Sequence, residues 1–239
     1  MQTDPIPTTT ASPTKTNLML KFITLDFWNT IATPNPAFAK ARNEFLHQHS
    51  TLSLEAVGKI YTETKAELDE MAETCGDAYS TMGCIGILLE KINPSLCEHE
   101  EAAAYQRVIT INRQIQQLAL EFPPIIAGEL LHSIRDLKAK GLGVGIISNT
   151  NFISGLTIRQ LCIAHFCKFD TYSFSDEIAS SKPDPHIFMH NMHQSGATEE
   201  ELIHIGDNTV CDGGAEDLGI KTVIVKNPTD TIFALQALL

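Results

Sequence analysis

The chain has 239 residues, of which 43% are hydrophobic, enough to bury a sizeable core in one domain with an insertion or in two small domains. Its formal net charge of −12 argues against broad electrostatic binding to nucleic acid or anionic lipid, because both need clustered lysine and arginine. No run of roughly 18 or more apolar residues occurs, so we expect no membrane-spanning helix. A small ligand, brought in with a metal ion, fits this charge better than a nucleic acid or a membrane.

Residues 1–20 are rich in threonine, proline and serine and lack the basic start and apolar run of a secretory signal, so we expect a flexible leader. The six cysteines are spread along the chain without a CxxC pair, which is typical of reduced thiols in a cytoplasmic protein. One compact group of possible metal ligands, Cys162, His165 and Cys167, lies in an apolar stretch of helical character. We expect core packing there and no metal site.

The first strand is predicted at residues 22–25, a short β-favouring run that ends in Asp26. From residue 36 to about 122 the pattern changes to long helical segments, including 54–74 and 98–120. A helix with apolar residues at Leu130, Ile134 and Leu137 follows, and then a strand at 144–147. Further strands are predicted near 171–174, 202–205 and 222–225, with helices near 153–165, from 184 onward, near 214–218 and at the end of the chain.

Strands separated by helices of this length need crossover connections, and therefore a parallel sheet covered on both faces. We predict an α/β fold with a doubly wound, Rossmann-like core at residues 21–34 and 124–239 and an inserted α-helical cap at 35–123. Ligands of such sheets bind at the carboxyl ends of the strands. Asp26, Ser148 and Asp207 follow predicted strands and are therefore candidate site residues.

The loop after the fourth predicted strand presents two carboxylates. Asp207 follows Gly206, whose missing side chain allows close approach, and Asp212 lies five residues later. Carboxylates from separate loops repel one another unless a hard cation such as Mg²⁺ lies between them. Together with Asp26, this loop predicts a magnesium site.

Two further segments carry groups that suit an anion. Lys182 is held on a shaped turn by the proline that follows it, and Ser148 and Asn149 offer donors where a helix begins. Each residue taken alone also has a simpler structural explanation. Asp26 suits a turn, Lys182 an exposed surface position, and the pair Ser148 and Asn149 a helix cap.

Four motifs in this order resemble those of the haloacid dehalogenase (HAD) superfamily, and the resemblance extends from about residue 21 to the end of the chain. The motifs are the sequence DFWNT at residues 26–30, Ser148-Asn149, Lys182-Pro183, and Gly206-Asp207 with Asp212. The resemblance implies a magnesium-dependent phosphatase that acts on a small phosphorylated metabolite. The ordered set is far more specific than any one of its members.

Roles for individual residues are carried over from that resemblance. It implies that Asp26 attacks phosphorus to form an aspartyl phosphate, and that Lys182 neutralises charge on the nucleophile and the phosphate. Ser148 and Asn149 would bind the phosphoryl oxygens. The implied magnesium ligands are Asp26, the backbone carbonyl of Trp28 and Asp207, with Asp212 supporting the site.

Trp28 departs from the phosphatase pattern, which places a second aspartate two residues after the nucleophile as general acid and base. Positioned proton transfer contributes about 10² to 10⁴ in rate, so poor leaving groups should suffer most unless water or a cap residue supplies the proton. Two alternatives follow. One is a phosphate- and magnesium-binding protein with impaired turnover; the other is a haloacid dehalogenase, a class that resembles this chain in lacking the second aspartate but works without a metal.

The cap is expected to lie over the strand ends and to carry substrate specificity between residues 37 and 120. Its arginines, Arg42, Arg107 and Arg113, could bind a substrate anion, but each lies in an amphipathic helix, so solvated salt bridges are expected and no specificity residue is assigned. His204 lies in an apolar strand and is expected to point toward packing or toward a neighbouring backbone, and no zinc site is expected at His186 and His190. A cap contact and a dimer contact give the same amphipathic pattern, so the sequence makes no prediction of oligomeric state.

Overall fold

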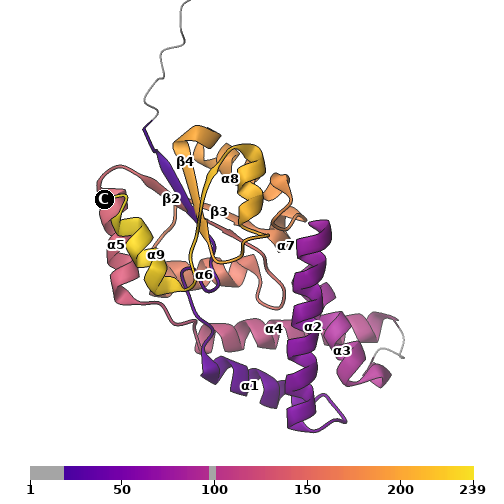
Figure 1. Ribbon diagram of the computed structural model, residues 1–239. Coiled ribbons are helices and arrows are strands. Elements are labelled where there is room, and N and C mark those ends of the chain that lie inside the picture. Colours follow the sequence, from indigo (N-terminus) through magenta and orange to yellow (C-terminus); the bar gives the residue numbers. More distant parts are fainter. Residues whose placement is uncertain (1–18, 97–100) are drawn as a thin grey trace, which may run out of the picture.

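The computed structural model describes residues 19–96 and 101–239, so nearly all of the predicted leader and Cys97 lie outside the described residues (Figure 1). Five parallel strands form one sheet in the order β3-β2-β1-β4-β5. The strands are β1 (Phe22–Leu25), β2 (Gly143–Ser148), β3 (Thr171–Phe174), β4 (Leu202–Gly206) and β5 (Lys221–Ile224). The parallel α/β fold predicted from the alternation of strands and helices is confirmed.

Helices cover both faces of this sheet because the strands are apolar on both sides. Ile23 and Leu25 of β1 pack in the larger core, whereas Phe22 packs in the smaller one. The larger core includes residues of α5 (Gly128–Ala139), α6 (Gly155–His165) and α9 (Pro228–Gln236). The smaller core includes residues of α8 (Pro185–Ser195) and of the 3-10 helix η3 (Gly213–Leu218).

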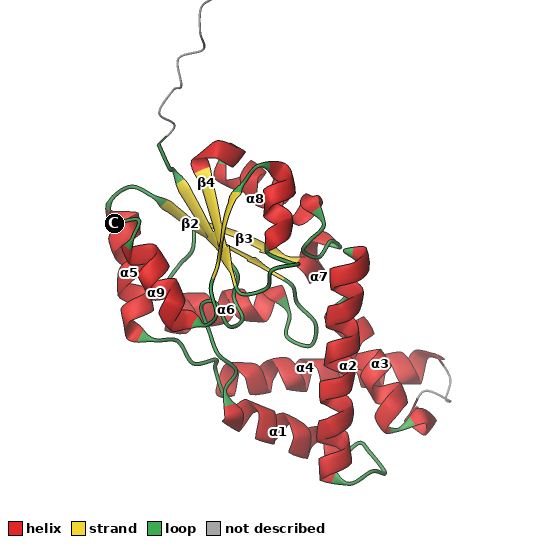
Figure 2. Cartoon of the chain, in the orientation of Figure 1, coloured by secondary structure: helices red, strands yellow, loops and turns green. Residues whose placement is uncertain are grey.

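A group of helices between β1 and β2 lies to one side of the sheet and contains no strand among its described residues (Figure 2). These helices, called the cap helices below, are α1 (Pro36–His47), α2 (Leu54–Cys75), α3 (Thr81–Ile92) and α4 (Glu101–Glu121), with the short 3-10 helix η1 (Pro94–Leu96). Side-chain caps start α1, α2 and α3, at Asn35, Ser53 and Ser80. The division of the chain at residues 35 and 123 stays a prediction.

The two segments that connect the sheet to the cap helices are hydrogen-bonded to each other. Thr33 and Ile125 form an antiparallel bridge with two backbone hydrogen bonds of 2.9 Å. The Asn35 side chain also donates to the carbonyl oxygen of Pro123 at 2.9 Å. The cap helices therefore leave and rejoin the core at one place, close to the carboxyl end of β1.

Some local predictions are corrected by the structure. The short segment expected to be a helix near 214–218 is the 3-10 helix η3, which suits a run with two glycines. Core packing was predicted for Cys162, His165 and Cys167; Cys162 is buried, but His165 is exposed and does not pack in the core. None of the described helices combines the length and the apolar character that crossing a membrane requires.

Candidate active site

The site is built where β1 and β4 end side by side. Leu25 pairs with Ile205, and the amide of Asp26 donates to the Ile205 carbonyl at 2.9 Å. Asp26 and Asp207 therefore leave neighbouring strands at the same edge of the sheet. Asn29, in the left-handed region with φ 56°, turns its amide back to Asp207 Oδ2 at 3.1 Å.

Gly206 is required for the close approach of Asp212 to the end of β4. A Cβ atom at position 206 would overlap the Asp212 carboxyl group. The same carboxyl group accepts a hydrogen bond from the Asn208 amide at 2.9 Å, which fixes the loop between the two aspartates. One short loop thus holds both carboxylates, as the sequence predicted.

Lys182 bridges two carboxylates in the interior. Its Nζ lies 2.7 Å from Asp26 Oδ1 and 2.5 Å from Asp212 Oδ1, and all three side chains are buried. The Asn149 side chain holds the lysine backbone in place, because it accepts from the Lys182 amide at 2.7 Å and donates to the Lys182 carbonyl at 2.9 Å. Lys182 is therefore a buried member of the site and not an exposed lysine.

The two carboxylates that Lys182 bridges have pKa values shifted in opposite directions. Burial raises the pKa of Asp26 to about 7; Lys182 opposes this shift, and the charges of Asp212 and Asp207 add to it. Burial also raises the pKa of Asp212, but Lys182 and His204 outweigh burial and hold it below its usual value. Further positive charge beside Asp26 would oppose the effect of burial and favour the charged carboxylate.

His204 packs in the interior, as predicted, and it also contacts a carboxylate of the site, which the sequence did not predict. The ring is fully buried, with Nε2 2.9 Å from Asp212 Oδ1 and Nδ1 2.9 Å from the Thr24 hydroxyl. Burial lowers the pKa of His204 and favours the neutral ring, while the Asp212 carboxylate opposes this shift. Because the Asp212 carboxylate can only accept hydrogen bonds, Nε2 of His204 carries the proton. Nδ1 then accepts a hydrogen bond from the Thr24 hydroxyl. The chain from Thr24 through His204 orients Asp212.

Of the two predicted phosphate-binding residues, Ser148 is buried in the interior, whereas Asn149 lines the cavity of the site. The Ser148 side chain is fully buried, and its hydroxyl makes a long bond of 3.3 Å to the Asn149 carbonyl. Asn149 lines the cavity that contains Asp26, but its amide is already engaged with Lys182. The Trp28 carbonyl, a predicted metal ligand, has no hydrogen-bond donor among the described residues.

Helix α2 closes the cavity over Asp26 from the cap side. The cavity measures about 160 Å³, and Lys65, Asp69 and Glu73 line it at successive turns of the helix. Asp69 accepts from Asn151 at 2.7 Å, and Glu73 accepts from Asn208 at 2.6 Å. Sequence reasoning gave no role to these α2 side chains, since solvated and site-facing charges share one helical periodicity.

A cation would fit between the three aspartates. Oxygen atoms of Asp26, Asp207 and Asp212 all lie within 4.8 Å of one another, the one group of possible metal ligands found in the part of the chain that the structure describes. Burial raises the pKa of Asp207, as it does that of Asp26. A hard, oxygen-ligated cation such as Mg²⁺ would relieve this repulsion. The oxygen-only donor set suits magnesium and not zinc.

Comparisons with known proteins show the family and the fold. A family model described as haloacid dehalogenase-like hydrolase matches residues 20–215. The chain belongs to this family. Its fold resembles that of a 2-haloacid dehalogenase from Pseudomonas syringae pv. Tomato DC3000, with a TM-score of 0.62 and 18% identity over 92% of this chain and 99% of that one. A HAD phosphatase from Thermococcus onnurineus gives a TM-score of 0.52 and 16% identity over 86% of each chain. At these identities the likeness shows the fold alone.

Two curated relatives match at higher identity over a shorter stretch. The chain is 34% identical over 99 residues to a glyceraldehyde 3-phosphate phosphatase of Methanothermobacter thermautotrophicus, covering 38% of this chain and 41% of the relative. It is 30% identical over 105 residues to the protein of the same name from Methanopyrus kandleri, covering 41% and 42%. The match thus spans less than half of each relative.

Proposed function

We propose that the protein is a magnesium-dependent phosphatase that acts on a small phosphorylated metabolite through an aspartyl phosphate on Asp26. The observation that carries this proposal is the convergence of three carboxylates at the carboxyl ends of β1 and β4, two of which are bridged by a buried lysine. The similarity to two proteins named as phosphatases supports it.

In the proposed reaction, an Asp26 carboxylate oxygen attacks phosphorus, and the bond from phosphorus to the leaving oxygen breaks. Water then attacks phosphorus, which releases inorganic phosphate and restores the Asp26 carboxylate. Lys182 reduces the repulsion between Asp26 and the incoming phosphoryl oxygens. Ser148 and Asn149 are proposed to bind those oxygens, and the long Ser148 hydroxyl bond is one that a phosphoryl oxygen could replace.

Mg²⁺, when bound, supplies positive charge for the nucleophile and the phosphoryl oxygens. Asp26, Asp207 and the free carbonyl of Trp28 would hold it, with Asp212 in support. Asp212 is fixed by Lys182, by His204 and by the amide of Asn208, so it enters the site with its orientation set.

The leaving group must take its proton from somewhere other than residue 28. Trp28 has no acidic proton, and positioned proton transfer contributes about 10² to 10⁴ in rate. We therefore propose that acyl and aryl phosphates are better substrates than alkyl phosphates. The proton comes from water or from a cap side chain. Asp69 and Glu73 are the candidates among the cap residues, because both line the cavity that contains Asp26. Complete loss of turnover would leave a phosphate- and magnesium-binding protein.

A haloacid dehalogenase is the second candidate, because Trp28 puts an aromatic residue where that class also lacks the second aspartate. The acidic cluster argues against it. Asp26, Asp207 and Asp212 would repel the carboxylate of a haloacid unless a cation lay between them, and that class works without a metal. A requirement for Mg²⁺ separates the two candidates.

Phosphate release from acetyl phosphate and from 4-nitrophenyl phosphate tests the proposal. The wild type, Asp26→Asn and a matched control, Asp217→Asn at an exposed position in η3, are compared with Mg²⁺ and with a chelator. We expect release by the wild type and the control only with Mg²⁺, and none by Asp26→Asn. Absence of release in every condition, or release by Asp26→Asn, would reject the proposal.

A cytoplasmic location is also proposed. Five cysteines among the described residues are free, and burial raises the pKa of the Cys211 thiol beside the site to about 12. These thiols fit a reducing compartment. Separation of cell fractions followed by antibody detection tests this location.

A further inference from the structure

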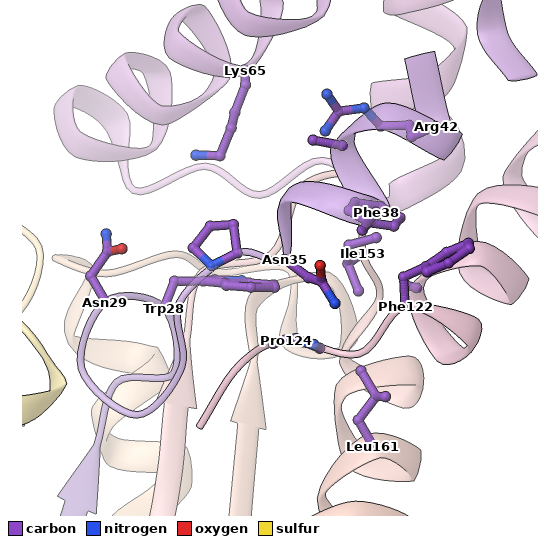
Figure 3. Close-up of a pocket in the computed structure, with 13 residues that line it drawn as sticks. Trp28, Asn29, Asn35, Phe38, Arg42, Lys65, Phe122, Pro124, Ile153 and Leu161 are labelled. Carbon is purple, nitrogen blue, oxygen red and sulfur yellow. The ribbon is translucent and has the colours of Figure 1, made fainter. Parts of the chain in front are cut away.

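A second cavity opens directly beside the one that contains Asp26. It measures about 190 Å³ and shares Trp28, Asn29 and Lys65 with the catalytic cavity. Figure 3 shows the Trp28 ring along one side, with Phe38, Phe122 and Leu161 at the far end. The cavity lies between the cap helices and the core, and its lining is mostly apolar.

Arg42 of α1 brings a charge to this apolar cavity. The side chain lines the cavity, yet the residue is only 8% exposed. Its guanidinium carbon lies 3.4 Å from the ring centroid of Tyr61 and 5.6 Å from that of Phe38. Its hydrogen bonds of 3.1 and 2.8 Å go to the neutral amide oxygen of Asn43. The expectation of a solvated salt bridge at Arg42 was wrong, because the aromatic partners come from a different turn and a different helix.

No carboxylate pairs with Arg42 among the residues that the structure describes. Lys182, which is also buried, pairs with two carboxylates. Lys65, the second cation of the cavity, already pairs with Asp69 at 2.5 Å. Burial lowers the pKa of Arg42, with Tyr61 opposing, but a guanidinium stays protonated in proteins. Buried arginines without an acidic partner are rare, because desolvating an unpaired charge is costly.

We propose that this cavity holds the leaving group of the substrate, and that the leaving group is a ring-sized apolar body carrying a carboxylate that pairs with Arg42. The inference rests on the proposed phosphatase function, since the phosphoryl group must lie at Asp26 next door. Size supports a single ring, because an apolar cavity of about 150 Å³ holds benzene. The carboxylate of the ligand supplies an acidic partner, which Arg42 lacks among the described residues.

This ligand differs from the one named for the curated relatives. Glyceraldehyde 3-phosphate has a short polar leaving group with no second anion and no apolar body. It would leave the walls formed by Phe38, Phe122 and Leu161 uncovered and Arg42 unpaired. We therefore expect it to be a poor substrate beside an aryl phosphate that carries a carboxylate.

Binding can be measured without turnover, because Trp28 is the single tryptophan of the chain and lies in this cavity. Cyclohexanecarboxylate, which does not absorb where tryptophan does, is titrated into the full chain with Mg²⁺ and Trp28 fluorescence is followed. Its neutral isostere, cyclohexanecarboxamide, is titrated in parallel. We expect saturable binding of the acid and roughly 10- to 100-fold weaker binding of the amide, the size of one charge-assisted hydrogen bond.

Arg42→Gln is compared with Arg113→Gln, which changes an exposed arginine of α4. We expect the acid and the amide to bind Arg42→Gln equally, whereas Arg113→Gln keeps the preference for the acid. Circular dichroism checks that each variant is folded. If Arg42→Gln does not fold, the comparison of acid with amide on the wild type decides alone. Equal affinity of the two ligands for the wild type would overturn the inference.

Turnover gives the second readout. We expect kcat/KM for 4-carboxyphenyl phosphate to exceed that for 4-carbamoylphenyl phosphate by roughly 10-fold or more in the wild type, and not in Arg42→Gln. Phosphate release with no preference for the acid would overturn this inference and leave the phosphatase proposal standing. Acid-selective binding without any phosphate release would support the cavity assignment and reject the phosphatase proposal.

Discussion

Replacement of Gly206 by alanine would push a methyl group into the Asp212 carboxyl group at the end of β4. The clash cannot be relieved by a flexible side-chain tip, because this carboxyl group is fixed on three sides. It accepts from Lys182 at 2.5 Å, from His204 at 2.9 Å and from the Asn208 amide at 2.9 Å. Either Asp212 moves away from these donors or the strand end moves away from Asp26.

The destabilisation by Gly206→Ala can be estimated from the hydrogen bonds and the ion pair that Asp212 would lose. A hydrogen bond to a charged group contributes about 1.5 to 3 kcal/mol, and breaking a buried ion pair costs about 3 to 5 kcal/mol. Asp212 is 1% exposed, so water cannot replace the lost partners. We therefore expect Gly206→Ala to lower the free energy of unfolding by about 3 to 5 kcal/mol. That is a large share of the roughly 5 to 15 kcal/mol of a typical domain.

Urea denaturation followed by circular dichroism measures this loss, and phosphate release with Mg²⁺ measures its effect on the site. Gly213→Ala is the matched control, because a Cβ at position 213 would meet nothing within 4 Å. We expect the control to keep stability and activity, and Gly206→Ala to lose both. Wild-type stability together with a wild-type rate in Gly206→Ala would refute the packing role assigned to this glycine.

Three further substitutions test separate parts of the site. Trp28→Asp should restore a proton donor and raise the rate on glycerol phosphate by about 10² to 10⁴ relative to 4-nitrophenyl phosphate, and an equal change on both substrates would contradict this. Asp207→Asn should abolish the rise in melting temperature that Mg²⁺ gives the wild type, which corresponds to about 2.7 kcal/mol at a hundred times the dissociation constant; an undiminished rise would exclude Asp207 as a ligand. Glu73→Ala should remove the bond to Asn208 and speed hydrogen exchange at the end of α2, whereas unchanged exchange would show that this contact does not hold the helix.

The strand-end residues could be predicted because they follow local rules. The apolar run at β1 stops at Asp26, and the run at β4 stops at Gly206 and Asp207, so hydrophobic patterning marks where each strand delivers its polar residues. Asp212 was predicted because it shares a short loop with Asp207. The order of helices and strands was sufficient to predict a parallel sheet.

The contacts that the sequence did not predict depend on partners far away in the sequence. His204 sits in an apolar strand, and only the pairing of β1 with β4 brings it to Thr24, 180 positions away. Arg42 follows the periodicity of a solvated helix face, and its burial needs Tyr61 from α2. Periodicity shows which face of an element is covered, but it does not show which side chain covers it.

Detection of the covalent intermediate tests the central claim most directly. The wild type is mixed with acetyl phosphate and Mg²⁺, quenched in acid within one turnover, digested and examined by mass spectrometry. We expect the peptide that contains Asp26 to carry one added phosphoryl group, and the same peptide of Asp26→Asn to carry none. Release of phosphate without any phosphoryl group on Asp26 would contradict the assignment of Asp26 as the nucleophile.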